Sequence, residues 1–168
     1  MSSSQNPPAP ATDQLASLSP ESQKLVEMFH LEDVASHLLR RAHFMAEELF
    51  NAEFATEAIT PRQKAALVVV FQHPGLTQNA LAGHLFMDRN TVAEMVKRLC
   101  ANGLLQRTSA QNDQRAYQLY LTPKGADLLD RVLPRDFEVE RKLLERLPEE
   151  YRPLFLKCLK LMVVPDNT

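Results

Sequence analysis

The sequence has little of what several protein classes require. Of its 168 residues, only two are cysteines and only four are glycines. Cys100 and Cys158 lie far apart, with no CxxC motif and no Cys/His cluster, which excludes a disulfide framework and a zinc finger and fits a reducing compartment. The five histidines have neither HxxxH nor HExxH spacing. We therefore expect no metal site and no cofactor.

Long hydrophobic runs are also missing. The longest apolar stretches, such as Ala65–Phe71, are too short to cross a bilayer. The first residues, MSSSQNPPAPATDQ, have neither the basic nor the apolar region of an export signal. We expect a soluble cytoplasmic protein with no membrane partner. Because GxSxG, P-loop and GxGxxG motifs are absent as well, we do not expect an enzyme.

The whole chain has no large excess of either charge, but one segment has an excess of positive charge. With 19 basic and 21 acidic residues the net charge is -2, which excludes a protein that coats DNA indiscriminately. Residues 61–122, however, contain seven basic and three acidic residues, leaving twelve basic and eighteen acidic residues elsewhere. Because phosphate neutralisation supplies most non-specific DNA affinity, this local excess fits a DNA-contacting module.

The composition of the N-terminal part of the chain changes at about residue 20. Residues 1–20 are rich in Ser, Pro and Ala and predict a disordered tail. In residues 21–58, apolar positions spaced by three or four predict one long amphipathic helix that ends near Asn51. Its heptad recurrence suits packing along a second helix, so we expect an N-terminal dimerisation region. The recurring residues are Leu31, Leu38 and Met45.

Helix caps follow one another closely in the middle of the chain. Thr60 before Pro61, with Gln63 three residues after Thr60, predicts a capping box at the start of a helix, and Thr77 predicts the cap of a second one. Asp88 or Asn90 is the predicted cap of a third. The three helices are expected at residues 63–72, 78–85 and about 89–102, the last ending with Gly103 as a left-handed C-cap. Two short helices joined by a tight turn make a helix-turn-helix.

A change to short alternating runs after Gly103 predicts strands. Residues 104–107 and 116–121 fit the two strands of a hairpin, so residues 59–122 are predicted to form a winged helix-turn-helix DNA-binding domain. Residues 123–164 predict C-terminal dimerisation helices, because their apolar stripes exceed what a small winged helix could cover. The expected fold is mainly α with a small β-wing, in which a DNA-binding lobe joins a helical dimerisation region.

Six short motifs occur in order between Ile59 and Leu128. They are LTQNALAGHL at 76–85, MDRNTV at 87–92, MVKRL at 95–99, GLLQR at 103–107, DQR at 113–115 and LYLTPKG at 119–125. Together they resemble the DNA-binding core of the MarR family of transcriptional regulators. The resemblance implies a homodimer on a pseudo-palindromic double-stranded DNA operator, with half-sites about 34 Å apart. It also implies release from DNA by a small aromatic carboxylate or a phenol.

Two further stretches narrow the resemblance within the family. HLLRRAHF at 37–44 and FMDRNTVAEMVKRL at 86–99 are similar to the nicotinate-catabolism repressors, which respond to a hydroxylated pyridine carboxylate. The chain is therefore expected to be a repressor. Its expected effector is an acid such as hydroxynicotinate.

The third predicted helix of the winged unit is expected to turn Val92, Met95, Val96 and Leu99 toward the core. Its polar positions carry the main DNA-binding candidates. Residues in the first turn of a recognition helix reach base edges, with Arg suited to guanine and Asn to adenine. Later cations are expected on phosphates, and Glu94 either accepts from a cytosine amine or, as we favour, pairs with Arg98. The candidates are Gln78, Arg89, Asn90, Thr91, Glu94, Lys97, Arg98, Asp113 and Arg115.

Arg115 is expected at the tip of the wing. In the resembled family this arginine enters the minor groove, and we prefer this role to a local ion pair with Asp113 on a surface turn.

Polar and aromatic residues on one flank of the first predicted helix are effector candidates. His30, His37, Arg41 and Phe44 lie about 80 to 140 degrees to one side of the apolar stripe, at about 100 degrees per residue. A cation, two imidazoles and a ring could hold an aromatic carboxylate, and ordinary packing at a boundary is an equal alternative. Arg40, opposite the stripe, and His43, on the other flank, complete the set.

Two other functions remain open. A regulator that responds to thiol oxidation would use Cys100, although burial of both cysteines is the default expectation. A winged helix could also serve as a protein-interaction module without binding DNA. A steep loss of DNA affinity with added salt would distinguish the regulator from the module.

Overall fold

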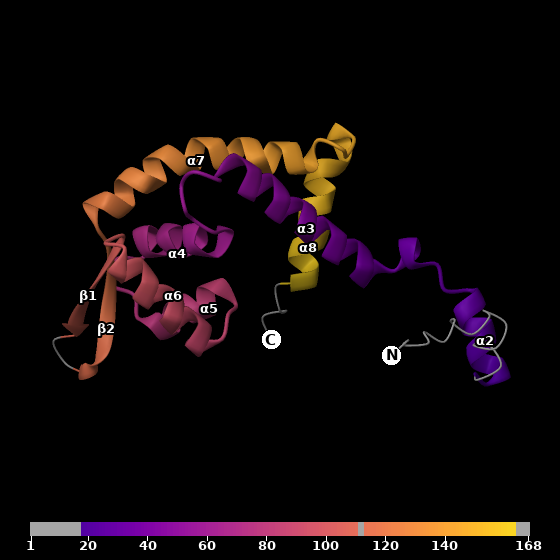
Figure 1. Ribbon diagram of the computed structural model, residues 1–168, viewed down its shortest axis with the longest axis horizontal. Helices are drawn as coiled ribbons and strands as arrows, with labels where there is room; N and C mark the ends of the chain where they lie inside the picture. The colour runs from indigo at the N-terminus through magenta and orange to yellow at the C-terminus, as the bar shows by residue number, and fades with distance from the viewer. Residues whose placement is uncertain (1–17, 111–112, 164–168) are drawn as a thin grey trace, which may run out of the picture. The chain divides into compact units, whose positions relative to one another are not determined.

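The computed structural model describes residues 18–110 and 113–163, and the chain divides into two compact units, residues 1–43 and 44–168 (Figure 1). The elements run in the order α2 (Pro20–Glu27), η1 (Leu31–Asp33), α3 (Ala35–Glu53), α4 (Pro61–Gln72), α5 (Gln78–Leu85), α6 (Arg89–Ala101), β1 (Leu105–Ala110), β2 (Asp113–Leu121), α7 (Pro123–Leu144), η2 (Glu149–Tyr151) and α8 (Arg152–Val163). The expected class, mainly α with a small β-wing, is confirmed. Most of the predicted disordered tail, residues 1–17, lies outside the described residues.

The first unit corrects the prediction of one long N-terminal helix. The helical segment is interrupted between α2 and α3, where His30 and Val34 adopt extended backbone conformations on either side of η1. No Gly or Pro marks this break in the sequence. Periodicity reports which positions are apolar, but it does not report whether the backbone hydrogen bonds continue. The heptad that included Leu31 therefore does not run along a single helix.

Local capping explains the three helices of the winged unit. The Thr60 hydroxyl accepts from the Gln63 backbone N–H at 3.2 Å, and the Gln63 side chain accepts from the Thr60 N–H at 3.0 Å, which is the predicted capping box. Thr77 caps α5, also as predicted. Of the two predicted caps for α6, Asp88 is the one used: its Oδ1 accepts from the Thr91 N–H at 2.8 Å.

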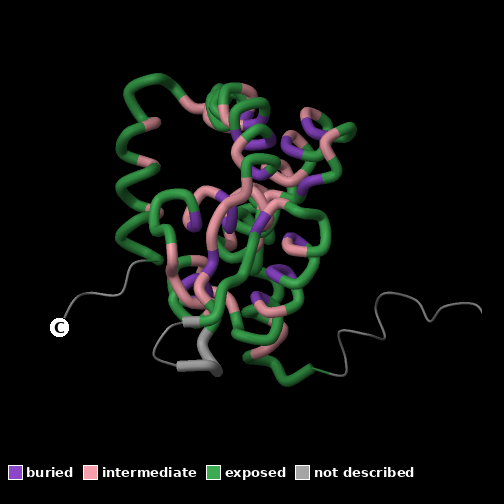
Figure 2. The backbone as a smooth tube through the Cα atoms, turned by 90° about the vertical axis from the view of Figure 1, so that its left-hand side faces the viewer, coloured by how far each residue is buried: buried purple, intermediate pink, exposed green. Residues whose placement is uncertain are grey.

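The core of the second unit is formed by the apolar faces of α4 to α7 and the wing. Its fully enclosed side chains include Leu67, Leu81, Val96, Leu119 and Val132. Figure 2 colours such buried positions purple. Burial of large aliphatic groups from every element of the winged unit stabilises this lobe by removing apolar surface from water. This packed core therefore holds in place the helices that carry the surface side chains.

The wing is an antiparallel hairpin in which Leu105 lies opposite Leu121, with a register shift after Ser109. Its strands are longer than predicted, because the polar residues next to the turn also join the backbone ladder. Alternating hydrophobicity detects only the part of a strand whose side chains are half buried. Gly103, with φ of +70°, ends α6 in the left-handed conformation that was predicted for it.

Ion pairs join α7 to the residues just before and within α4. Lys64 Nζ lies 2.8 Å and 2.6 Å from the two carboxylate oxygens of Asp136, the one buried charged residue within the described part of the chain. Arg135 binds Glu53 and Glu57 at 2.8 Å and 2.9 Å. The sequence offered no sign of these pairings, because the partners are more than 70 positions apart. Among residues 18–110 and 113–163, no helix combines the length and apolar content needed to cross a membrane.

Candidate nucleic-acid interface

Helix α6 has two chemically distinct faces. Val92, Met95, Val96 and Leu99 are buried, as the sequence predicted, and tie the helix to the core. Its predicted DNA-binding side chains are all exposed; they are Arg89, Asn90, Thr91, Glu94, Lys97 and Arg98. This face carries three cations and one carboxylate, so the helix presents a polar, mainly positive surface to solvent.

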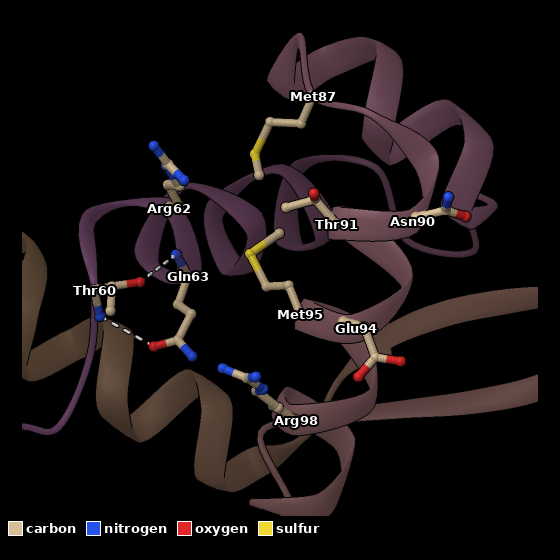
Figure 3. Close-up of a pocket in the computed structure, with 9 residues that line it drawn as sticks. All are labelled: Thr60, Arg62, Gln63, Met87, Asn90, Thr91, Glu94, Met95 and Arg98. Carbon is tan, nitrogen blue, oxygen red and sulfur yellow. Dashed lines mark hydrogen bonds between the residues drawn. The ribbon is translucent and has the colours of Figure 1, made fainter.

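A shallow hollow of about 440 Å³ lies between this face and the start of α4 (Figure 3). Asn90, Thr91 and Glu94 line one side, and Arg62 with Gln63 lines the other. Arg62 was not among the predicted site residues, although its position in the first turn of a helix of the winged unit could have indicated it. The hollow therefore places an additional cation beside the exposed face of α6.

Glu94 does not make the predicted ion pair with Arg98. Its carboxylate lies 3.9 Å from Lys97 Nζ, one turn along the helix at i,i+3, with both side chains about two-thirds exposed. Residues three and four apart are both neighbours on a helix, so the sequence pattern alone did not separate the two partners. Such an exposed pair contributes little to stability, and both groups stay accessible.

The cap of α6 is electrostatically well defined. Hydrogen bonds from Thr91, through its side chain and its backbone N–H, hold the pKa of Asp88 below its ordinary value. Asp88 is therefore ionised at neutral pH and satisfies the N–H groups at the start of the helix. This cap orients Arg89 and Asn90, which follow it directly.

The wing candidates are only partly covered by the structure. Asp113 and Arg115 belong to β2, but their side chains lie outside the part of the chain whose side chains are described. Gln78 is half-buried in the first turn of α5. The structure adds an exposed wing cation, Arg107 of β1, whose guanidinium lies 5.4 Å from the centre of the Tyr117 ring. Its place in the GLLQR motif was the available signal.

The effector candidates no longer share one helix. His37, Arg40, Arg41, His43 and Phe44 lie on α3, where His37 is half-buried and the others are exposed. His30, in contrast, precedes η1 and stands outside α3. The angular spacing that grouped it with the other candidates assumed a continuous helix and does not apply.

The two cysteines differ from each other. Cys158 on α8 is exposed, so the expectation that both are buried is wrong for this residue in the described chain. Cys100 is half-buried, and burial raises its pKa, with nearby Arg107 acting in the opposite direction. A raised pKa leaves less thiolate at neutral pH, which disfavours Cys100 as a reactive sensor.

The fold and this surface define a winged helix-turn-helix DNA-binding protein. The model of the MarR family matches residues 59–117. Across 152 residues the chain is 30% identical to a putative transcriptional regulatory protein for the hcr operon of Thauera aromatica, covering 88% of this chain and 91% of that one. The chain belongs to the MarR family of transcriptional regulators.

Two other similar proteins bear on its function. The chain is 26% identical to the HTH-type transcriptional repressor NicR of Pseudomonas putida, over 83% of this chain and 88% of NicR. The transcriptional repressor CouR, solved bound to a 23-mer DNA duplex, is 29% identical, with a TM-score of 0.75 over 80% of this chain and 96% of CouR. These relatives are regulators rather than enzymes.

Proposed function

We propose that the protein is a sequence-specific repressor that binds a pseudo-palindromic operator as a homodimer and leaves it when a small aromatic acid binds. The observation that carries this proposal is the division of α6 into a buried apolar face and an exposed face that holds three cations. The similarity to CouR, a repressor solved on DNA, supports it.

The start of α6 reads the bases in this proposal. Arg89 and Asn90 directly follow the Asp88 cap, so their side chains leave the lobe at the end of the helix that enters the major groove. Arg89 suits guanine and Asn90 suits adenine, while Thr91 contacts either a base or a methyl group. Lys97 and Arg98, further along the same face, neutralise phosphates. Glu94 is released from its weak pair with Lys97 when that lysine meets DNA.

The wing and the start of α5 supply the remaining contacts. Arg115 enters the minor groove, with Asp113 beside it holding the turn, and Gln78 donates to the backbone from the first turn of α5. Arg107, exposed on β1, is a further phosphate contact from the same hairpin. These contacts position the lobe on the duplex, whereas α6 selects the sequence.

Dimerisation follows from the size of the target and from exposed apolar groups. One recognition helix reads too few base pairs, and two copies about 34 Å apart read adjacent turns of the duplex. Helix α8 buries none of its residues in the single chain, and its side chains Leu154, Leu161 and Met162 are exposed. In the first unit Met28 and Phe29 are exposed as well. Apolar surface of this extent supports a partner chain.

A DNA selection followed by titration tests this function. We expect purified protein to enrich a pseudo-palindromic sequence, and its affinity for that sequence to fall steeply, by more than about 100-fold between 50 and 200 mM salt. Light scattering should give a mass of twice the 19.0 kDa of one chain. Failure to enrich any DNA would favour the protein-interaction module. Loss of binding only after peroxide treatment, reversed by a reductant and absent in Cys100→Ser, would favour the thiol-responsive regulator.

The effector is a separate part of the proposal. The resemblance of residues 37–44 and 86–99 to nicotinate-catabolism repressors supports a hydroxylated pyridine carboxylate. We expect 6-hydroxynicotinate to bind in a calorimetric titration and to release the selected DNA. Arg41 of α3 is the candidate partner of the carboxylate, so Arg41→Ala should weaken ligand binding about tenfold or more, because it removes a charged hydrogen-bond donor. Arg146→Ala, an exposed arginine just past the end of α7 and outside the effector candidates, is the control and should bind the ligand as the wild type does. No heat and no release of DNA would contradict this effector.

A further inference from the structure

Phe86 combines two unfavourable features. It ends α5 with φ of 51° and ψ of 42°, the left-handed conformation that crowds a Cβ atom and is usually left to Gly, Asn or Asp. Its side chain is also 80% exposed, so the ring gains almost nothing from packing in the free chain. A strained backbone that holds an exposed aromatic ring calls for a role outside the chain's own stability.

The turn explains the backbone conformation but not the ring. The Phe86 N–H donates to Gly83 O at 3.3 Å, and the Met87 N–H donates to Ala82 O at 3.1 Å, which closes the end of α5. Any residue that tolerates a positive φ would form the same turn, and glycine would form it without strain. The phenyl group is therefore an addition that the turn does not require.

Phe86 lies two residues before Asp88, the N-cap of the recognition helix α6. Met87, the next residue, lines the hollow beside α6 together with Asn90 and Thr91, and Asp88 then caps the helix. Phe86 thus precedes by three and four residues the side chains proposed to read bases. Because the first turn of a recognition helix enters the major groove, an exposed group a few residues before that turn lies within reach of the groove.

We propose that the Phe86 ring contacts the C5-methyl group of a thymine in each half-site, beside the bases read by Arg89 and Asn90. This inference rests on the proposed function. A phenyl ring has no hydrogen-bond donor for a phosphate, and the thymine methyl is the apolar group that the major groove displays. Phe86 is therefore a specificity-determining residue that selects thymine at one position.

Replacing single thymines by deoxyuridine in the selected operator tests the contact, because this change removes only the methyl group. For the wild type we expect about a tenfold loss of affinity at one symmetry-related pair of positions. Phe86→Gly and Phe86→Asn, which both accept the left-handed conformation, should bind the thymine operator about tenfold more weakly and show no further loss with deoxyuridine at that pair. Their melting temperatures should equal or exceed that of the wild type.

Phe71→Ala is the matched control. Phe71 is likewise exposed, at 66%, but it lies in the last turn of α4, whose opposite end carries Arg62 and borders the hollow. The affinity of the Phe71→Ala variant for the thymine operator should stay within twofold of that of the wild type. If both Phe86 variants bind the thymine operator with the affinity of the wild type, the contact is overturned. An equal loss of affinity with deoxyuridine in the wild type and the variants would also overturn it and would point to another partner for the ring. Absence of DNA binding by the wild type would instead overturn the proposed function.

Discussion

Replacing Asn90 by alanine should weaken operator binding at least about 30-fold without lowering the melting temperature. A side chain that pairs with an adenine edge contributes about 1–3 kcal/mol of discrimination, and a dimer on two half-sites loses this contribution twice. Asn90 is exposed and makes no part of the α6 cap, which Asp88 provides, so its truncation leaves the lobe intact. Fluorescence anisotropy with the selected operator measures the affinity.

Asn51→Ala is the control for this variant, because Asn51 is an exposed asparagine in the last turn of α3, outside the winged unit. It should bind the operator as the wild type does. A repeated DNA selection with the Asn90 variant should also lose its preference at one pair of positions. An Asn90→Ala protein that keeps both its affinity and its preferred sequence would remove this residue from the set of base contacts.

Replacing Asp136 by alanine should lower the free energy of unfolding by about 3 kcal/mol and the melting temperature by about 10 °C. The Asp136 and Lys64 side chains are 13% and 17% exposed, and Lys64 Nζ lies 2.6 Å from the nearer Asp136 oxygen. Lys64 also lies 5.5 Å from the centre of the Phe50 ring, in an environment with little water. Removing the carboxylate therefore leaves a largely desolvated charge without its partner. Thermal and urea unfolding at a fixed protein concentration measure the change.

Glu138→Ala supplies the matched comparison on the same helix. Glu138 pairs with Arg141 at 2.9 Å, but these side chains are 59% and 54% exposed, so the pair contributes less than about 1 kcal/mol. The double variant Lys64→Met with Asp136→Leu should recover most of the lost stability, because it removes both charges together. Equal melting temperatures for the Asp136 and Glu138 variants would show that the buried ion pair contributes no more to stability than the exposed one.

The winged unit was largely predictable because its signals are local. Thr60, Thr77 and Gly103 mark helix ends through hydrogen bonds or backbone angles within a few residues, and all three act as predicted. The apolar positions of α6 follow a 3.6-residue period, and each of the four predicted residues is buried. A reader of the sequence could thus place the exposed face of α6 without coordinates.

The first unit was less predictable for the same physical reason. Apolar spacing in residues 21–51 is compatible with one helix, and the extended conformations of His30 and Val34 have no Gly or Pro to announce them. This break separates His30 from the α3 residues that had been grouped with it. The exposure of Cys158 was equally hidden, because an apolar helix face is buried only where another element covers it.

The amino-acid sequence was enough to identify the family, the order of the helices of the winged unit and the wing, and the residues that α6 turns away from the core. The signals for all of these, which are helix caps, apolar spacing and short motifs, each lie within a few consecutive residues. Folding decided which distant charges meet, as in Lys64 with Asp136, which partner Glu94 takes, and that Phe86 is held exposed in a left-handed turn beside α6. Lys64 and Asp136 meet because α4 packs against α7, whereas the partner of Glu94 depends on its side-chain conformation and the position of Phe86 depends on a backbone angle. Residue spacing along the chain records none of these.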